Sequence, residues 1–227
     1  TEADVTGTWA GLRPLVKSAT TERTADLSRH HAVSRSASGV LSVTGGKLTT
    51  YRRMAEDAVD EISKRRCRTK KLRLHGAEGY DELVDEVDAA STRLGVAPEL
   101  VTHLANRYGG DTRVLAAMIT ADPTLGQPIV DGLPYVRAEA VHAVRYELAR
   151  TLDDVLTRRI PARWLQRDGA AAAALDVAQL IAPELGWNDD EVARQVAAFR
   201  ASIEHERAAS AGSSIEDIVP SARSSRS

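Results

Sequence analysis

One spacing pattern covers more than half of this chain: apolar residues recur every three or four positions from about Tyr80 to Ala208. That period is typical of α-helices with one buried face. Gly109-Gly110 and Pro161 interrupt it, as residues that end helices do. The pattern therefore predicts a helical domain over residues 80–208. Aromatic residues make up only 4% of the chain, so we expect its core to be aliphatic.

The positions of the stop signals divide this domain into separate helices. We expect helices over 81–94, from Pro98 to Tyr108, from a capping Asp111 through Ile119, over 137–159 as one long helix, over 170–182 and over 189–208. Proline suits the first turn of a helix, and aspartate suits the position before it. The segment 121–134 contains three prolines and two glycines and is predicted to be irregular. The last helix should bury Val192, Val196, Phe199 and Ile203.

The first part of the chain has a different texture. Residues 6–46 are rich in Thr, Ser and Gly, and the strand-like segments 29–35 and 40–44 flank Ser36-Ala37-Ser38-Gly39. A four-residue loop with a glycine is typical of a β-hairpin. The second strand runs into Gly45-Gly46 and then into a helix over about 49–64, with an apolar stripe on one face. The fold class is therefore mainly α, with a β-hairpin and a strand–helix segment before the helical domain.

Composition narrows the classes of function. The net charge of −2 gives no electrostatic reason to expect nucleic acid as a partner. The single cysteine, Cys67, fits a reducing, cytoplasmic compartment. No apolar run approaches the roughly 20 residues of a membrane-spanning helix. The histidines show no ligand spacing, so we expect no metal site. Because Thr1 is not preceded by a methionine, we expect it to be an internal residue of a longer polypeptide.

Three sequence blocks in the first region carry the chemical signal: Trp9–Leu15 (WAGLRPL), Ser28–His31 (SRHH) and Gly45–Glu56 (GGKLTTYRRMAE). A glycine pair between strand and helix allows close approach to a flat group, and the helix N-terminus favours negative charge. The alternative is a plain tight turn capped by Thr49 or Thr50. This block is not a phosphate loop of nucleotide hydrolases, because the glycine that the motif requires upstream of Gly46-Lys47 is absent. No G-x-G-x-x-G fingerprint occurs among the fifteen glycines.

A fourth block, Tyr135–Glu139 with Arg145–Glu147 and Thr151–Arg159, follows in the helical region. Together the blocks resemble FAD-dependent, quinone-linked sn-glycerol-3-phosphate dehydrogenases, from about Val5 to Phe199. The resemblance implies that residues 1–66 are the end of an FAD-binding α/β domain and that residues 80–208 are a helical C-terminal domain. Composition indicates a basic linker between them (67–79) and a disordered tail (209–227), which is rich in Ser and Arg and has too little apolar content to fold alone.

The resemblance also implies roles for single residues. Arg13 would lie over the flavin and bind the substrate, and Arg29 would grip the same phosphate. Arg13 and Lys47 would be catalytic, and the cofactor-binding residues would be Gly45, Gly46, Lys47, Leu48, Thr49 and Thr50. For Arg13, which lies between Leu12 and Pro14, a structural ion pair is the alternative. His31 matches a family histidine, and a structural and a catalytic role both stay open. The catalytic base is not identified.

The activity implied is oxidation of sn-glycerol 3-phosphate to dihydroxyacetone phosphate, with electrons passed from FAD to quinone. The alternatives are an oxidase that uses oxygen and, for the chain in isolation, a non-catalytic helical module for interaction or dimerisation. The partners implied are glycerol 3-phosphate, a quinone and a second subunit, with peripheral contact at the inner face of the cytoplasmic membrane. We expect the chain alone to be inactive, to bind FAD weakly and to leave residues 6–46 poorly ordered.

Overall fold

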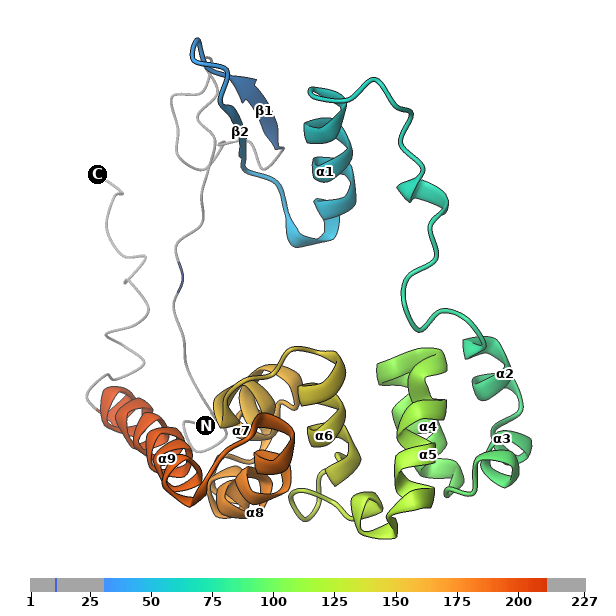
Figure 1. Ribbon diagram of the computed structural model, residues 1–227, viewed down its shortest axis with the longest axis vertical. Helices are drawn as coiled ribbons and strands as arrows, with labels where there is room; N and C mark the ends of the chain where they lie inside the picture. The colour runs from blue at the N-terminus through green and yellow to red at the C-terminus, as the bar shows by residue number, and fades with distance from the viewer. Residues whose placement is uncertain (1–10, 12–30, 212–227) are drawn as a thin grey trace, which may run out of the picture. The chain divides into compact units, whose positions relative to one another are not determined.

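The computed structural model describes residue 11 and residues 31–211 of the chain (Figure 1). These residues fall into two compact units, one ending at Leu74 and the other beginning at His75. The described part of the first unit contains a two-stranded sheet and a helix, and the second unit is helical. The mainly α fold class is therefore confirmed. The domain boundaries set by the resemblance remain a prediction.

The hairpin forms in the first unit as expected. Strands β1 (Ala32–Arg35) and β2 (Leu41–Thr44) are antiparallel, with Ala32 opposite Thr44. In the loop the Ser36 hydroxyl accepts a hydrogen bond from the Val40 amide at 3.0 Å. Gly39 has φ +87°, a conformation that favours glycine. Residues 12–30 lie outside the described residues, so the expected disorder of 6–46 stays a prediction.

The predicted helix after the hairpin is present but shorter. A 3₁₀ turn, η3 (Leu48–Thr50), leads directly into α1 (Tyr51–Asp60). The helix predicted to reach residue 64 ends four residues earlier, in a turn closed by the amide of Ser63 on the carbonyl of Val59. A second 3₁₀ turn, η4 (Thr69–Lys71), interrupts the basic segment that follows.

The second unit is helical throughout, as the apolar spacing predicts, and has two apolar clusters. Its elements are α2 (Tyr80–Asp85), α3 (Val87–Leu94), α4 (Pro98–Tyr108), η5 (Gly109–Asp111), α5 (Thr112–Ala121), η6 (Pro123–Gly126), α6 (Arg137–Tyr146), the π-helix η7 (Asp154–Arg159), α7 (Ala162–Leu165), α8 (Arg167–Leu185) and α9 (Asp189–Ala211). The first cluster forms between α2 and α5, around Leu104, and the second lies among α6 to α9, around Phe199. Helix α6 contributes Ala138 to the first cluster and Ala140 to the second.

The irregular segment 121–134 contains one 3₁₀ turn, and Pro128 and Val136 form an isolated β-bridge across its end. Helix α9 buries the four residues that were predicted. Pro98 occupies the first turn of α4 as expected. Asp111 precedes α5, but its side chain does not cap it. The Thr112 hydroxyl instead donates to the carbonyl of Gly109 at 2.7 Å, and Asp111 accepts from His75 at 2.7 Å.

Two of the predicted helices are each divided in the structure. The helix expected over 81–94 breaks at Glu86, where φ is −129° and ψ is 54°, outside the helical range. Both halves pack on α4, and the break lets Leu83 and Ala90 be fully buried. A single straight helix would direct its two ends along one line, whereas two short helices follow the curvature of the core.

The single long helix predicted over 137–159 is wrong. Helix α6 ends at Tyr146, and Leu148 has φ +58°, an unfavourable value for a residue with a Cβ. Arg159 fixes the corner, because its Nε and a terminal nitrogen donate to the carbonyl of Glu147 at 3.0 and 2.7 Å. Thr151 and Asp154 then start a new helical segment by reciprocal capping: the Asp154 amide donates to the Thr151 hydroxyl, and the Asp154 carboxylate accepts from the Thr151 amide, both at 3.0 Å.

A buried carboxylate links the two parts of the helical unit. Glu139, in the first turn of α6, is fully buried. Its oxygens accept from the Val136 amide at 2.8 Å, from His103 Nε2 at 3.1 Å and from Arg107 Nε at 3.1 Å. His103 and Arg107 both belong to α4. The carboxylate therefore caps its own helix and holds α4 against α6.

Replacing Glu139 with Ala should lower the free energy of unfolding by about 3 kcal/mol, because it removes a fully buried carboxylate and its hydrogen bonds with the Val136 amide, His103 and Arg107. Urea unfolding followed by helical circular dichroism measures this loss. The exposed Asp85→Ala variant is the control and should change the stability by less than about 0.5 kcal/mol. An equal effect in both variants would contradict the role given to Glu139.

A buried histidine makes the stability of this unit depend on pH. His142 is 4% exposed and lies between the rings of Tyr108 and Tyr146, with centroids 4.8 and 4.9 Å away. Its Nδ1 has no hydrogen-bond partner among the described residues and lies 4.0 Å from the carboxylate of Glu147. Burial lowers the pKa of His142, although the negative charge of Glu147 acts in the opposite sense.

Because the folded state disfavours protonated His142, its contribution to stability is full above the unfolded pKa of about 6.5 and is lost as the pH falls below it. Urea unfolding at pH 8 and pH 5 should show a larger loss in the wild type than in His142→Phe, which cannot titrate. A loss of the same size in both proteins would show that other groups cause the acid sensitivity.

Candidate functional site

The glycine pair after β2 makes a turn that other residues would not fit. Gly45 and Gly46 have φ of +74° and +81°. A Cβ added to Gly46 would lie 2.4 Å from the sulfur of Met54, which projects from α1. The positive φ therefore favours glycine at position 46, and the end of the Met54 side chain would have to move to admit a Cβ there.

A threonine hydroxyl fixes the residue after the glycines. The Thr50 hydroxyl accepts from the Lys47 amide at 3.1 Å and donates to the Lys47 carbonyl at 2.9 Å. Of the two threonines considered as caps, Thr50 therefore closes the turn. Lys47 is exposed, and the Leu48 side chain next to it is 88% exposed. The turn thus exposes a cation and an apolar side chain at neighbouring positions, and the Thr50 hydroxyl holds the backbone of Lys47 through two hydrogen bonds.

A histidine–carboxylate pair connects the hairpin with the helix. His31, directly before β1, lies 2.7 Å through Nε2 from the Asp57 carboxylate of α1. Arg53 binds the other oxygen of Asp57 at 3.0 Å. The sequence pattern singled out His31 but not Asp57, which was one of many charged residues on a predicted helix. Only the pairing shows that it matters.

The described residues of this unit, 31–74, include no fully buried side chain. Several large apolar side chains are exposed on it instead, among them Val40, Leu48, Tyr51, Val59, Ile62, Leu72 and Leu74. Exposed apolar side chains in this number indicate a surface that binds something else. A groove of 680 Å³ runs between α1 and the basic segment that includes Cys67. Cys67 itself contacts the Thr69 hydroxyl at 3.0 Å.

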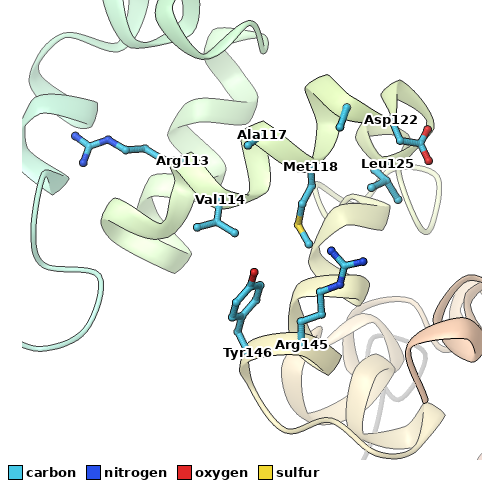
Figure 2. Close-up of a pocket in the computed structure, with 9 residues that line it drawn as sticks. Arg113, Val114, Ala117, Met118, Asp122, Leu125, Arg145 and Tyr146 are labelled. Atoms are coloured by element: carbon cyan, nitrogen blue, oxygen red, sulfur yellow. The ribbon is translucent and has the colours of Figure 1, made fainter. Parts of the chain in front are cut away.

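The helical unit has a groove of 730 Å³ between α5 and α6 (Figure 2). Its floor is apolar, with Ala117 and Met118, and Figure 2 shows Arg145 and Tyr146 opposite them. Arg113 at one end binds Glu82 at 2.9 Å, and Arg145 forms two hydrogen bonds with Glu184. Because both cations are already paired, the groove offers no free positive charge for an anionic substrate.

The structure places six of the predicted site residues, Gly45 to Thr50, in one continuous turn and 3₁₀ segment. Arg13 and Arg29 lie outside the described residues, so their roles stay predictions. Over residues 31–211, no group of three His, Cys, Asp or Glu side chains could hold a metal ion. No helix in this range is long and apolar enough to cross a membrane.

Comparison with known proteins identifies relatives for nearly the whole chain. Residues 67–192 match the model of the C-terminal domain of alpha-glycerophosphate oxidase. Glycerol-3-phosphate dehydrogenase 2 of Mycobacterium tuberculosis is 39% identical over 91% of this chain and 36% of its own length. Glycerol-3-phosphate dehydrogenase of Mycobacterium leprae is 37% identical over the same shares.

A solved structure agrees with these relatives. The crystal structure of glycerol-3-phosphate dehydrogenase from Bacillus halodurans complexed with FAD matches with a TM-score of 0.62 and 25% identity, over 76% of this chain and 37% of that one. The chain thus spans about a third of the length of the proteins that it matches. It belongs to the family of the C-terminal domain of alpha-glycerophosphate oxidase, and over most of its length it is homologous to FAD-dependent glycerol-3-phosphate dehydrogenases.

Proposed function

We propose that this chain is part of an enzyme that oxidises sn-glycerol 3-phosphate to dihydroxyacetone phosphate. The proposal is based on the 39% sequence identity with glycerol-3-phosphate dehydrogenase 2 of Mycobacterium tuberculosis over 91% of the chain. The reaction removes a hydride from C2 and a proton from its hydroxyl. FAD, when bound, supplies the redox chemistry by accepting the hydride, and a quinone is the proposed final acceptor.

The Gly45–Thr50 turn fits the role of one wall of a flavin site. The glycine backbone lacks side chains that would keep a flat ring away. The exposed Lys47 offers a positive charge and Leu48 an apolar contact at the same edge. Leu48, Thr49 and Thr50 would hold the cofactor from the 3₁₀ turn. These features match the chemistry of a ring that becomes negatively charged on reduction.

Arg13 and Arg29 are proposed to bind the substrate phosphate. A phosphate monoester carries up to two negative charges, so two guanidinium groups balance it where one would leave charge uncompensated. Arg13 would also lie near C2 and act in catalysis beside Lys47. The helical unit would brace the flavin-binding part, and we assign it no catalytic side chain.

A second candidate function is an oxidase that passes electrons to oxygen, and the family match to the alpha-glycerophosphate oxidase domain favours it. An oxygen electrode distinguishes the two with the full-length protein. A dehydrogenase should reduce a quinone analogue without consuming oxygen, and an oxidase should release hydrogen peroxide. The chain alone tests the third alternative, a helical interaction module: it should purify without a flavin absorbance band.

In the full-length enzyme, Arg13→Ala should lower kcat/KM by roughly 30-fold to several thousand-fold, because losing one partner of a desolvated charge pair costs about 2–5 kcal/mol. Arg13→Lys should not restore activity, since an ammonium cannot give two parallel hydrogen bonds to phosphate. Steady-state kinetics at matched flavin content measure both variants.

Cys67→Ser is the control for Arg13, because Cys67 lies in the basic segment and has no assigned role. It should leave kcat/KM unchanged. If Arg13 grips only the phosphate, KM should rise while kcat stays constant, and if it also stabilises charge at C2, kcat should fall. An Arg13→Ala enzyme within threefold of wild type would refute the assignment.

A further inference from the structure

The hairpin register places His31 beside the glycine turn. The antiparallel register ends with Ala32 opposite Thr44, so His31 and the Gly45–Gly46 turn follow at the same end of the sheet. A Cβ added to Gly46 would lie 3.2 Å from the Cβ of His31. The histidine backbone and Cβ therefore form one side of the space in which the turn sits.

Helix α1 forms the other side of this space. Met54 contacts Gly46 from α1, and Asp57 follows Met54 by one helical turn. The 2.7 Å bond from His31 to Asp57 joins the two sides. Because a carboxylate only accepts, His31 donates from Nε2. The two side chains are 18% and 29% exposed, so the bond is largely shielded from water.

The same strand and helix are joined a second time, away from the turn. Arg35, at the far end of β1, donates to the carbonyl of Glu61 at 2.7 Å, in an exposed position. This contact also holds the hairpin to the helix, but it touches none of the residues from Gly45 to Thr50. It provides an internal comparison for what the His31–Asp57 bond adds.

We propose that His31 and Asp57 are positioning residues for the oxidation of glycerol 3-phosphate. Their bond holds the Gly45–Gly46 turn between hairpin and helix and thereby sets the place of Lys47 at the edge of the flavin. The proposal rests on the proposed function. It gives His31 a role through Gly46 and Lys47, and not as the base that removes the substrate proton; the pH–rate profile of His31→Ala distinguishes the two roles.

The test uses the full-length, FAD-loaded enzyme and follows bleaching of the flavin by glycerol 3-phosphate in stopped flow. His31→Ala and Asp57→Ala should each slow reduction by roughly 10- to 100-fold, since a displacement of about 1 Å near the reacting atoms has effects of this size. The dissociation constant for glycerol 3-phosphate should change less than threefold. The double variant should be no slower than either single one, because both remove the same bond.

Three further measurements separate positioning from a general loss of structure. Asp57→Asn keeps an acceptor for His31 and should recover part of the rate. Arg35→Gln should reduce at the wild-type rate. The visible circular dichroism of the bound flavin should change in His31→Ala and Asp57→Ala but not in Arg35→Gln, and this readout does not depend on turnover.

Wild-type rates and an unchanged flavin dichroism in both alanine variants would overturn the proposal, and so would losses that multiply in the double variant. Loss of the acidic limb of the pH–rate profile in His31→Ala would make His31 the base and would also overturn it. If His31→Ala does not load FAD, the comparison of Asp57→Asn with Arg35→Gln, by flavin reduction rate and flavin circular dichroism, decides between positioning and a general loss of structure. A wild-type enzyme that glycerol 3-phosphate fails to reduce would instead refute the proposed function itself.

Discussion

The helical unit depends on one buried charge. Glu139 lies where α4 meets α6. Its two carboxylate oxygens accept hydrogen bonds from the Val136 amide at the start of α6, from Arg107 and from His103. A carboxylate without these partners would be costly to bury. The Arg107 guanidinium that it binds also lies over the rings of Tyr108 and Tyr135, 5.4 and 4.9 Å from their centroids. The polar link and the aromatic contacts thus orient α4 and α6 together.

That link explains how the two apolar clusters of an aliphatic domain keep a fixed orientation relative to each other. The hydrophobic effect is non-directional, so aliphatic packing by itself imposes little orientation on two neighbouring helices. Hydrogen bonds to a fixed carboxylate have strict geometry. Helix α6 faces both clusters, so fixing its first turn fixes the side chains that it contributes to each.

The hairpin unit is stabilised in a different way. Over residues 31–74 it has no fully buried side chain, and its internal contacts include exposed or partly buried hydrogen bonds and ion pairs, such as Arg52 with Glu56 at 2.8 Å. Exposed pairs of this kind contribute little to stability. Its exposed apolar side chains indicate that another surface covers them. This arrangement fits the role proposed for the Gly45–Lys47 turn as one wall of a flavin site.

Much of this protein could be predicted from the sequence, because the information is local. Apolar periodicity predicts the helices, Ser36–Gly39 predicts the hairpin loop, and the glycine pair predicts the tight turn before α1. The Thr151–Asp154 capping pattern was also present in the sequence and could have shown that the helix after Arg137 does not continue to Arg159.

Other features were decided only by the tertiary structure, since they join residues far apart in the chain. The break at Glu86 follows from the curvature of the core around α4, and the positive φ of Leu148 follows from the hold of Arg159 on the preceding carbonyl. Asp57 became part of the candidate site only because the packing of the hairpin against α1 brings His31 to it across 26 positions. A local sequence pattern determines the secondary structure of a segment, whereas tertiary packing determines which side chains distant in the sequence come into contact.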